Sequence, residues 1–170
     1  MNRMWKIILA AGLAIALPVA AVFAGNVHLN GDVTFSKGSL TASGVLAGLG
    51  NDDVNVILVG SGMGTATCRN KGGNVAPGQT PIQVEVSGLQ SIPATLFENG
   101  STPFSVTVED PPWPTAREAG CPNRNWSVVA FTVSWTGAVI TVESLATGEI
   151  LLEQAYSCVT TLDSVVCTPL

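Results

Sequence analysis

Most cationic side chains of this chain lie next to two cysteines, Cys68 and Cys121. Arginine and lysine bind carboxylates and phosphates, asparagine hydrogen-bonds to hydroxyls, and tryptophan stacks on flat apolar faces such as those of sugar rings. If the two cysteines form a disulfide, side chains of all three kinds come together. The sequence therefore predicts a binding site for a cell-surface glycan or anionic polymer, formed by Arg69, Asn70, Lys71, Asn74, Trp113, Arg117, Asn123, Arg124 and Trp126.

A purely structural interpretation of the same residues stays open. Asparagine and glycine are common in turns for conformational reasons alone, and charged side chains often do no more than keep a loop solvated. Trp126 stands at the start of an alternating segment, where a core position suits it equally well. The two interpretations differ in one respect: only the first requires the cations themselves to contact a ligand.

Enzymatic chemistry has little support in the sequence. The chain has one histidine, His28, which excludes sites built from two imidazoles, as most zinc hydrolase centres are. No Gly-x-Ser-x-Gly nucleophile elbow occurs, and Glu109, Asp110 and Glu118 offer only the carboxylate pairs that any acidic protein contains. We therefore predict no catalytic residue, no metal site, no cofactor and no enzymatic activity.

The charge balance and the length narrow the class of protein further. The 170 residues include seven Lys and Arg against twelve Asp and Glu, a net charge of −5. A nucleic-acid-binding protein needs a basic face, so we expect no nucleic acid partner. Only 11% of residues are charged and 46% are hydrophobic, which excludes a charge-rich disordered chain and a coiled coil. The length fits one domain.

The first 24 residues have the pattern of a secretory signal peptide. Arg3 and Lys6 precede the apolar run 7–17, and Val22-Phe23-Ala24 supplies small residues at the positions expected before a cleavage site. We predict a signal helix over 1–24, removed before Gly25, and one secreted domain over 25–170 with no stable membrane anchor after cleavage. An uncleaved anchor is the alternative. Cleavage leaves five cations and twelve acids, a net charge of −7.

The four cysteines, Cys68, Cys121, Cys158 and Cys167, all follow this segment. An even count in a small secreted domain indicates disulfides, with three possible connectivities. If the residues between Cys158 and Cys167 form a hairpin turning at Leu162-Asp163, these two cysteines face each other across it, and Cys68–Cys121 then follows. A four-cysteine zinc site is the alternative, but the paired short spacings typical of such sites do not occur.

Period-two alternation between turn residues indicates an all-β protein, and strand signals every 8–12 residues favour a two-sheet antiparallel β-sandwich of Ig-like or Greek-key type. Thr136-Gly137 predicts a hairpin turn between two strands, and Gly60, Gly62 and Gly64 predict bulges or close contact between sheets. Two long loops, 70–81 and 109–125, carry the candidate site. The predicted strands are 33–35, 39–46, 54–60, 65–68, 82–86, 104–108, 126–136, 138–143 and 149–158.

Three sequence blocks resemble a family of small secreted bacterial proteins of unknown function. The run from Cys68 to Gln79 is similar to a Cys-x-Asn-x-Gly-Gly-Asn-x-x-Pro-Gly-Gln signature, and residues 38–44 and 118–126 are similar to two further blocks, so that the similarity covers roughly residues 33–157. The resemblance implies secretion and a Cys68–Cys121 disulfide. Cys158 and Cys167 are an addition to the pattern, and the family transfers no activity.

We therefore expect a secreted, non-enzymatic structural or binding protein of the cell envelope or extracellular space. One alternative is the carbohydrate- or anionic-polymer-binding module described above, which uses the loops around Cys68 and Cys121. A second alternative is a self-assembling surface protein, because exposed Thr- and Val-rich strands permit edge-to-edge pairing unless charges block it.

Overall fold

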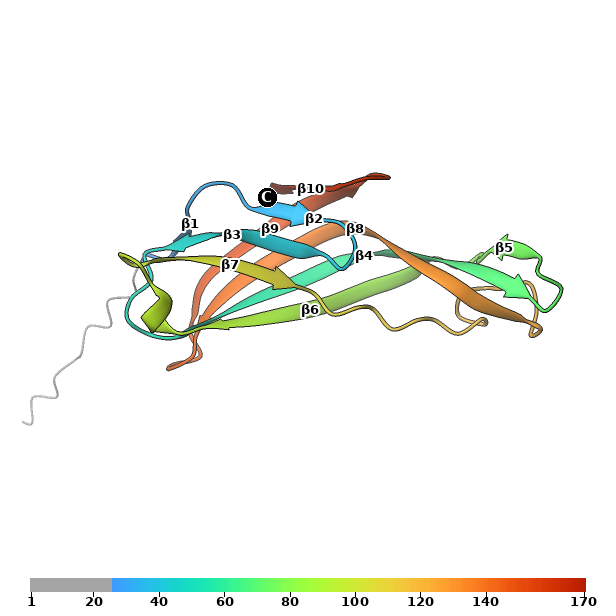
Figure 1. Cartoon of the computed structure of the whole chain (residues 1–170), viewed down its shortest axis with the longest axis horizontal. Helices are drawn as coiled ribbons and strands as arrows, with labels where there is room; N and C mark the ends of the chain where they lie inside the picture. Colours follow the sequence, from blue (N-terminus) through green and yellow to red (C-terminus); the bar gives the residue numbers. More distant parts are fainter. Residues whose placement is uncertain (1–25) are drawn as a thin grey trace, which may run out of the picture.

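A computed structural model of the chain describes residues 26–170, and the predicted signal helix lies outside them. The described residues form two antiparallel β-sheets that pack face to face (Figure 1). The predicted fold class, an all-β two-sheet sandwich with disulfides, is therefore confirmed. Within residues 26–170, no helix is long and apolar enough to cross a membrane.

The smaller sheet is built around β3 (Thr41–Ala47). Two short strands, β1 (His28–Leu29) and β2 (Thr34–Ser36), share one edge of β3, and β7 (Ser101–Thr107) pairs along the whole of the other edge. The smaller sheet is therefore only three strands wide and as long as a seven-residue strand.

The larger sheet is dominated by two long neighbouring strands, β4 with 17 residues and β8 with 19. The short strand β5 and the strand β6 lie one after the other along the free edge of β4, and a 3-10 turn, η1, connects β6 to β7. The elements are β4 (Val54–Asn70), β5 (Val75–Pro77), β6 (Ile82–Ile92), η1 (Ala94–Leu96), β8 (Trp126–Ser144), β9 (Ile150–Thr160) and β10 (Val165–Pro169), and the sheet order is β10-β9-β8-β4 followed by β5 and β6.

The larger sheet projects well beyond the smaller one (Figure 1). We call residues 62–81 and 111–135 the extension, and the rest of the described chain the sandwich. The extension contains the distal parts of β4 and β8, the strand β5, and most of the connection 109–125. That connection, which we call the strap, contains no strand and runs along the extension (Figure 1). The predicted site loops are both in the extension.

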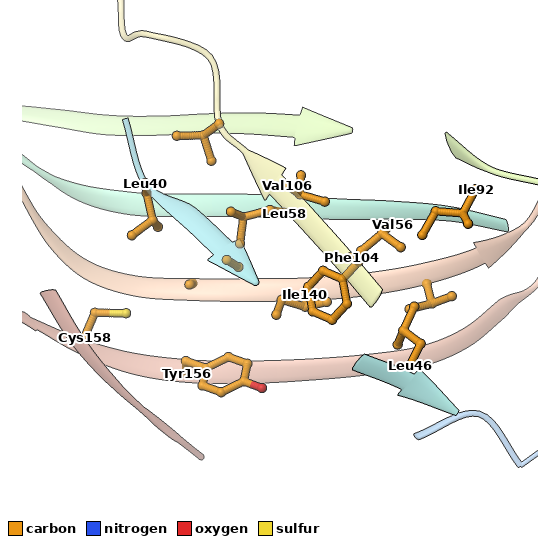
Figure 2. Close-up of a cluster of buried hydrophobic side chains, with 14 of the residues drawn as sticks. Leu40, Leu46, Val56, Leu58, Ile92, Phe104, Val106, Ile140, Tyr156 and Cys158 are labelled. Carbon is orange, nitrogen blue, oxygen red and sulfur yellow. The ribbon is translucent and has the colours of Figure 1, made fainter. Parts of the chain in front are cut away.

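The sandwich core lies between the two sheets and consists mainly of branched aliphatic side chains. Alternate residues of β4 point inward, as the period-two pattern predicts, because successive side chains of a strand lie on opposite faces. Leu40, Leu46, Leu58 and Ile140 are completely buried there (Figure 2). Phe35 and Tyr156 close one side of the core, with their ring centroids 5.0 Å apart.

The predicted hairpin at Thr136-Gly137 is wrong, because β8 continues through both residues. Ser61 pairs with Gly137 and Gly62 pairs with Trp135, so Thr136 is an extra residue in a β-bulge. The bulge absorbs one residue and keeps Trp135 on the inner face. Residues 54–60 and 65–68, predicted as two strands, are likewise one strand, β4. The strand β5 lies within the predicted loop 70–81.

Candidate functional site

Two disulfides join the cysteines in the predicted pairs. Cys68 bonds to Cys121, with Cα atoms 5.8 Å apart, and Cys158 bonds to Cys167, its directly paired neighbour across the β9–β10 hairpin. Disulfides persist in oxidising environments and are rare in the cytosol. The protein therefore belongs to an oxidising compartment outside the cytoplasm.

The Cys68–Cys121 disulfide fastens the strap to the inner face of the extension. Cys68 is completely buried (0% exposed), and Ala66 and Ala119 are buried beside it. Backbone hydrogen bonds continue the attachment: Gly78 N–H donates to the Ala66 carbonyl, and Thr80 N–H donates to the Ala119 carbonyl. The strap thus takes the place that the second sheet has in the sandwich.

A glycine allows this close approach. A Cβ atom on Gly78 would lie 2.5 Å from the carbonyl oxygen of Ala119, which is closer than real Cβ contacts come. The backbone of residues 78–80 can therefore pair with the strap only if residue 78 has no side chain.

A tight turn at residues 115–118 of the strap was not among the predicted features. Both the backbone N–H and the hydroxyl of Thr115 donate to Glu118 Oε2 at 2.8 Å, and the Glu118 N–H donates back to the Thr115 hydroxyl at 3.3 Å. These hydrogen bonds hold the pKa of Glu118 below its ordinary value. The spacing Thr-x-x-Glu is the capping-box pattern, which is the signal that could have found this turn.

Seven of the nine predicted site residues meet at the free end of the extension. Asn70 pairs in register with Trp126, and Arg69 pairs with Ser127, so the end of β4 lies beside the start of β8. The turns that follow β4 and precede β8 therefore lie together. We call this surface the basic tip, and it consists of Arg69, Asn70, Lys71, Asn74, Asn123, Arg124 and Trp126.

The asparagines of the basic tip hold its turns. Asn70 Oδ1 accepts the N–H of Asn74 at 3.0 Å, and Asn123 Oδ1 accepts the N–H of Asn125 at 3.0 Å. These two side-chain oxygens thus accept hydrogen bonds from the backbone, which agrees with the interpretation that the asparagines serve to form turns. The side chains of Arg69, Lys71 and Arg124 are exposed, and Trp126 is partly exposed.

Charge is segregated along the molecule. The extension carries four cations, Arg69, Lys71, Arg117 and Arg124, and a single acid, Glu118, whose carboxylate is hydrogen-bonded to Thr115. The remaining described residues carry one cation, Lys37, and eleven acids. Five of these acids lie at the opposite end of the molecule, in the turns and strand ends around the start of β4: Asp52, Asp53, Glu98, Glu143 and Glu149.

Trp113 is not part of the basic tip. It lies at the start of the strap, is 61% exposed, and lines a cleft of about 370 Å³ at the junction of the sandwich and the extension. Lys37 and Ser39, from the turn between β2 and β3, also line the cleft, together with Asp110. Arg117, the ninth predicted residue, is exposed on the strap. Phe131 and Trp135 of β8 also line the cleft.

The glycine-rich run of β4 makes room for these two aromatic rings. A Cβ on Gly60 would lie 3.0 Å from Trp135 Cζ3, and a Cβ on Gly64 would lie 2.2 Å from Phe131 Cζ. The predicted bulge is found opposite Ser61 and Gly62, whereas the close approach at Gly64 lies within the larger sheet and not between the two sheets. It is made by an aromatic side chain of the neighbouring strand.

A larger hollow lies at the sandwich end near η1. Its volume is about 570 Å³, and its lining includes Gln90, Ile92, Leu96, Thr102 and Pro103, with Glu98 as its one ionisable residue. Its lining has no aromatic or cationic side chain, so we assign no ligand to this hollow.

No protein-family model, curated protein or solved structure matches this chain. Among residues 26–170, no group of three or more His, Cys, Asp and Glu side chains is placed to hold a metal ion. The function is therefore inferred from the surface chemistry of the extension.

Proposed function

We propose that this is a non-enzymatic binding protein, secreted or held in the cell envelope, whose basic tip binds an anionic polymer such as an acidic surface glycan. The observation that carries the proposal is the segregation of charge. The extension has four cations and one hydrogen-bonded acid, whereas the sandwich has one cation and eleven acids. A scattering of solvating charges would follow no such division.

The tip is electrostatically separate from the acidic end. β4 runs from the acidic end to the tip, and at about 3.3 Å per residue its 17 residues span about 50 Å. Charges are screened over about 8 Å at physiological salt, so the acids at the far end do not weaken the field at the tip. A polyanion that approaches along the long axis meets cations first.

The tip is also rigid enough to act as a binding surface. The Cys68–Cys121 disulfide and the turns held by Asn70 and Asn123 fix the backbone from which Arg69 and Arg124 project. A guanidinium forms paired hydrogen bonds with carboxylate, phosphate or sulfate groups, and a backbone that is already ordered need not be ordered on binding. The side-chain cations, rather than the asparagine oxygens, are assigned the contacts with the ligand.

The proposal is tested with the mature protein, dextran sulfate and polygalacturonate, with neutral dextran as the reference polymer. Binding to both polyanions should be tighter than any binding to dextran, and only binding to the polyanions should weaken as salt rises. The double variant Arg69→Ala/Arg124→Ala should bind about tenfold more weakly, because two charge-assisted contacts are lost.

A charge-matched variant distinguishes the effect of losing the two tip arginines from the effect of the changed net charge. Adding Asp52→Asn and Glu149→Gln to the double variant restores the wild-type net charge while leaving the tip without its two arginines. If the tip is the site, this quadruple variant binds as weakly as the double variant. Recovery of wild-type binding, or no effect of the arginine substitutions, would overturn the proposal.

A further inference from the structure

We propose that the cleft beside Trp113 is a second binding site and that it takes a neutral saccharide unit. It is separate from the basic tip and does not rest on the function proposed there. The cleft combines an exposed indole, an aromatic floor and a rim of hydroxyl, carboxylate and ammonium groups: Lys37, Ser39, Asp110, Trp113, Phe131 and Trp135.

Trp113 is held in an exposed position by its neighbours in the sequence. Pro111 and Pro112 precede it and Pro114 follows it, and each proline fixes its own φ near −65° and restricts the residue before it. The indole is therefore presented on a stiff segment, and binding costs little conformational entropy. Trp113 is 61% exposed, although the apolar surface of an indole favours burial.

The one polar atom of the two aromatic side chains in the floor, Trp135 Nε1, already has a hydrogen-bond partner within the protein. Trp135 Nε1 donates to the Gly38 carbonyl at 3.3 Å, and Trp135 is almost completely buried. Phe131 lies against Gly64, where a side chain would displace its ring. The partly exposed Phe131 therefore supplies the apolar surface of the floor, and Trp135 brings no unpaired polar atom to it, which suits the apolar face of a sugar ring.

The rim keeps hydrogen-bonding capacity for a ligand. The Ser39 hydroxyl donates to Asp110 Oδ1, so the other oxygen of the carboxylate is left to accept from a ligand hydroxyl. Lys37 Nζ donates to the carbonyls of Thr161 and Leu162, which uses two of its three N–H groups. Lys37 and Asp110 both line the cleft, so the rim holds one cationic group and one anionic group.

These features favour a neutral, hydroxylated ligand. One ammonium and one carboxylate give the rim no net charge, so a polyanion gains nothing there, in contrast to the basic tip. A volume of about 370 Å³ lies within the ordinary range for small-ligand sites. A proline-rich peptide also docks on aromatic grooves, but it has no hydroxyl groups for the Asp110 carboxylate.

The test uses the mature protein and an array of neutral oligosaccharides that includes the hexaoses of cellulose, xylan, mannan and chitin. A glycan that binds on the array is then titrated by calorimetry and by tryptophan fluorescence. We expect Trp113→Ala to weaken binding at least tenfold, Trp113→Phe to retain part of the affinity, and Asp110→Asn to lie between wild type and Trp113→Ala.

Leu96→Ala is the matched control, since Leu96 is 60% exposed and lies at the far end of the sandwich. Trp113→Ala removes an exposed side chain, and an unchanged melting temperature verifies that the variant is folded. Binding to no neutral glycan on the array overturns the proposal, and so does equal binding by wild type and Trp113→Ala. Binding of decaproline at Trp113, with no glycan bound, assigns the cleft to peptides and overturns it too.

Discussion

The inner face of the larger sheet is covered in different ways in the sandwich and in the extension. In the sandwich, a second sheet supplies large buried side chains such as Leu40 and Leu46 against Leu58 and Ile140. In the extension, the strap supplies only Ala119 against Ala66 and Cys68, and a disulfide holds it in place. Burial of apolar area stabilises the first region, whereas a covalent bond replaces missing area in the second.

This difference explains where functional side chains are placed. A strand in a sandwich alternates between core and solvent, so at most half of its residues are free to bind a ligand. The strap has no such periodicity, and its residues Trp113, Arg117 and Arg124 are all exposed. Irregular segments carried by a rigid sheet commonly bear function, and here the disulfide allows such a segment to remain ordered.

The largest effect is expected when the disulfide of the extension is removed. Cys68 and Cys121 are 53 residues apart in sequence, and constraining a loop of that length stabilises a fold by about 4 kcal/mol. We expect Cys68→Ala/Cys121→Ala to free the strap, so that amide exchange accelerates in residues 62–81 and 111–125 much more than in the core strands. Urea denaturation and hydrogen exchange measure the two effects.

The second disulfide is the matched control. Cys158 and Cys167 are only 9 residues apart, so Cys158→Ala/Cys167→Ala should cost about 3 kcal/mol at most, with faster exchange confined to β9 and β10. If removal of Cys68–Cys121 accelerates exchange equally in the sandwich and the extension, the two regions unfold as one unit and the distinction between them fails.

The sequence allowed the fold class to be predicted, because the alternation of side chains along a strand is a local property. Strand length was not predictable in the same way. Gly60, Gly62 and Gly64 resemble a break in a strand, yet they continue β4. Groups of β8 occupy the space that their side chains would need: the rings of Trp135 and Phe131 at Gly60 and Gly64, and the Ser134 carbonyl at Gly62. That compensation comes from a strand about 70 residues later in the chain, and no local pattern reveals it.

The candidate site likewise contains residues whose placement could be predicted from the sequence and residues whose placement could not. Residues close in sequence to Cys68 and Cys121 were placed together, since their position follows from the disulfide. Trp113 was placed in the wrong group, because the path of the strap depends on its contacts with residues 78–80 and not on its own sequence. Lys37, Ser39 and Asp110 were missed as partners of Trp113 for the same reason.

A smaller effect is expected from a single methyl group under the strap. Because a Cβ on Gly78 would lie 2.5 Å from the Ala119 carbonyl oxygen, Gly78→Ala must push the strap away, at a cost of about 1–3 kcal/mol. Exchange of the Thr80 amide, which donates to Ala119, should accelerate. Gly50→Ala is the control, since no atom lies within 4 Å of its Cβ position. Equal stability of the two variants would mean that the strap tolerates displacement.

The smallest expected effect is the response of the strap to acid. The pKa of Glu118 is held below its ordinary value of 4.5 by its hydrogen bonds to Thr115, so the folded strap favours the ionised form. This stabilisation is present above pH 4.5 and is lost as the pH falls through the lower folded pKa. Glu118 is fully exposed, so the loss should loosen the turn at Thr115 without unfolding the sandwich.

Glu118→Gln provides the control for this titration, because glutamine keeps an oxygen that accepts from Thr115 but does not ionise. In the wild type, the NMR shift of the Thr115 amide should titrate with a midpoint below 4.5, and in Glu118→Gln it should stay constant. Below the wild-type midpoint the two proteins should show similar amide exchange across the strap turn, whereas at pH 6 the wild type should be the better protected. A wild-type midpoint at or above 4.5 would mean that Glu118 does not stabilise the strap in its ionised form, and the disulfide would then be the main restraint on the covering of the extension.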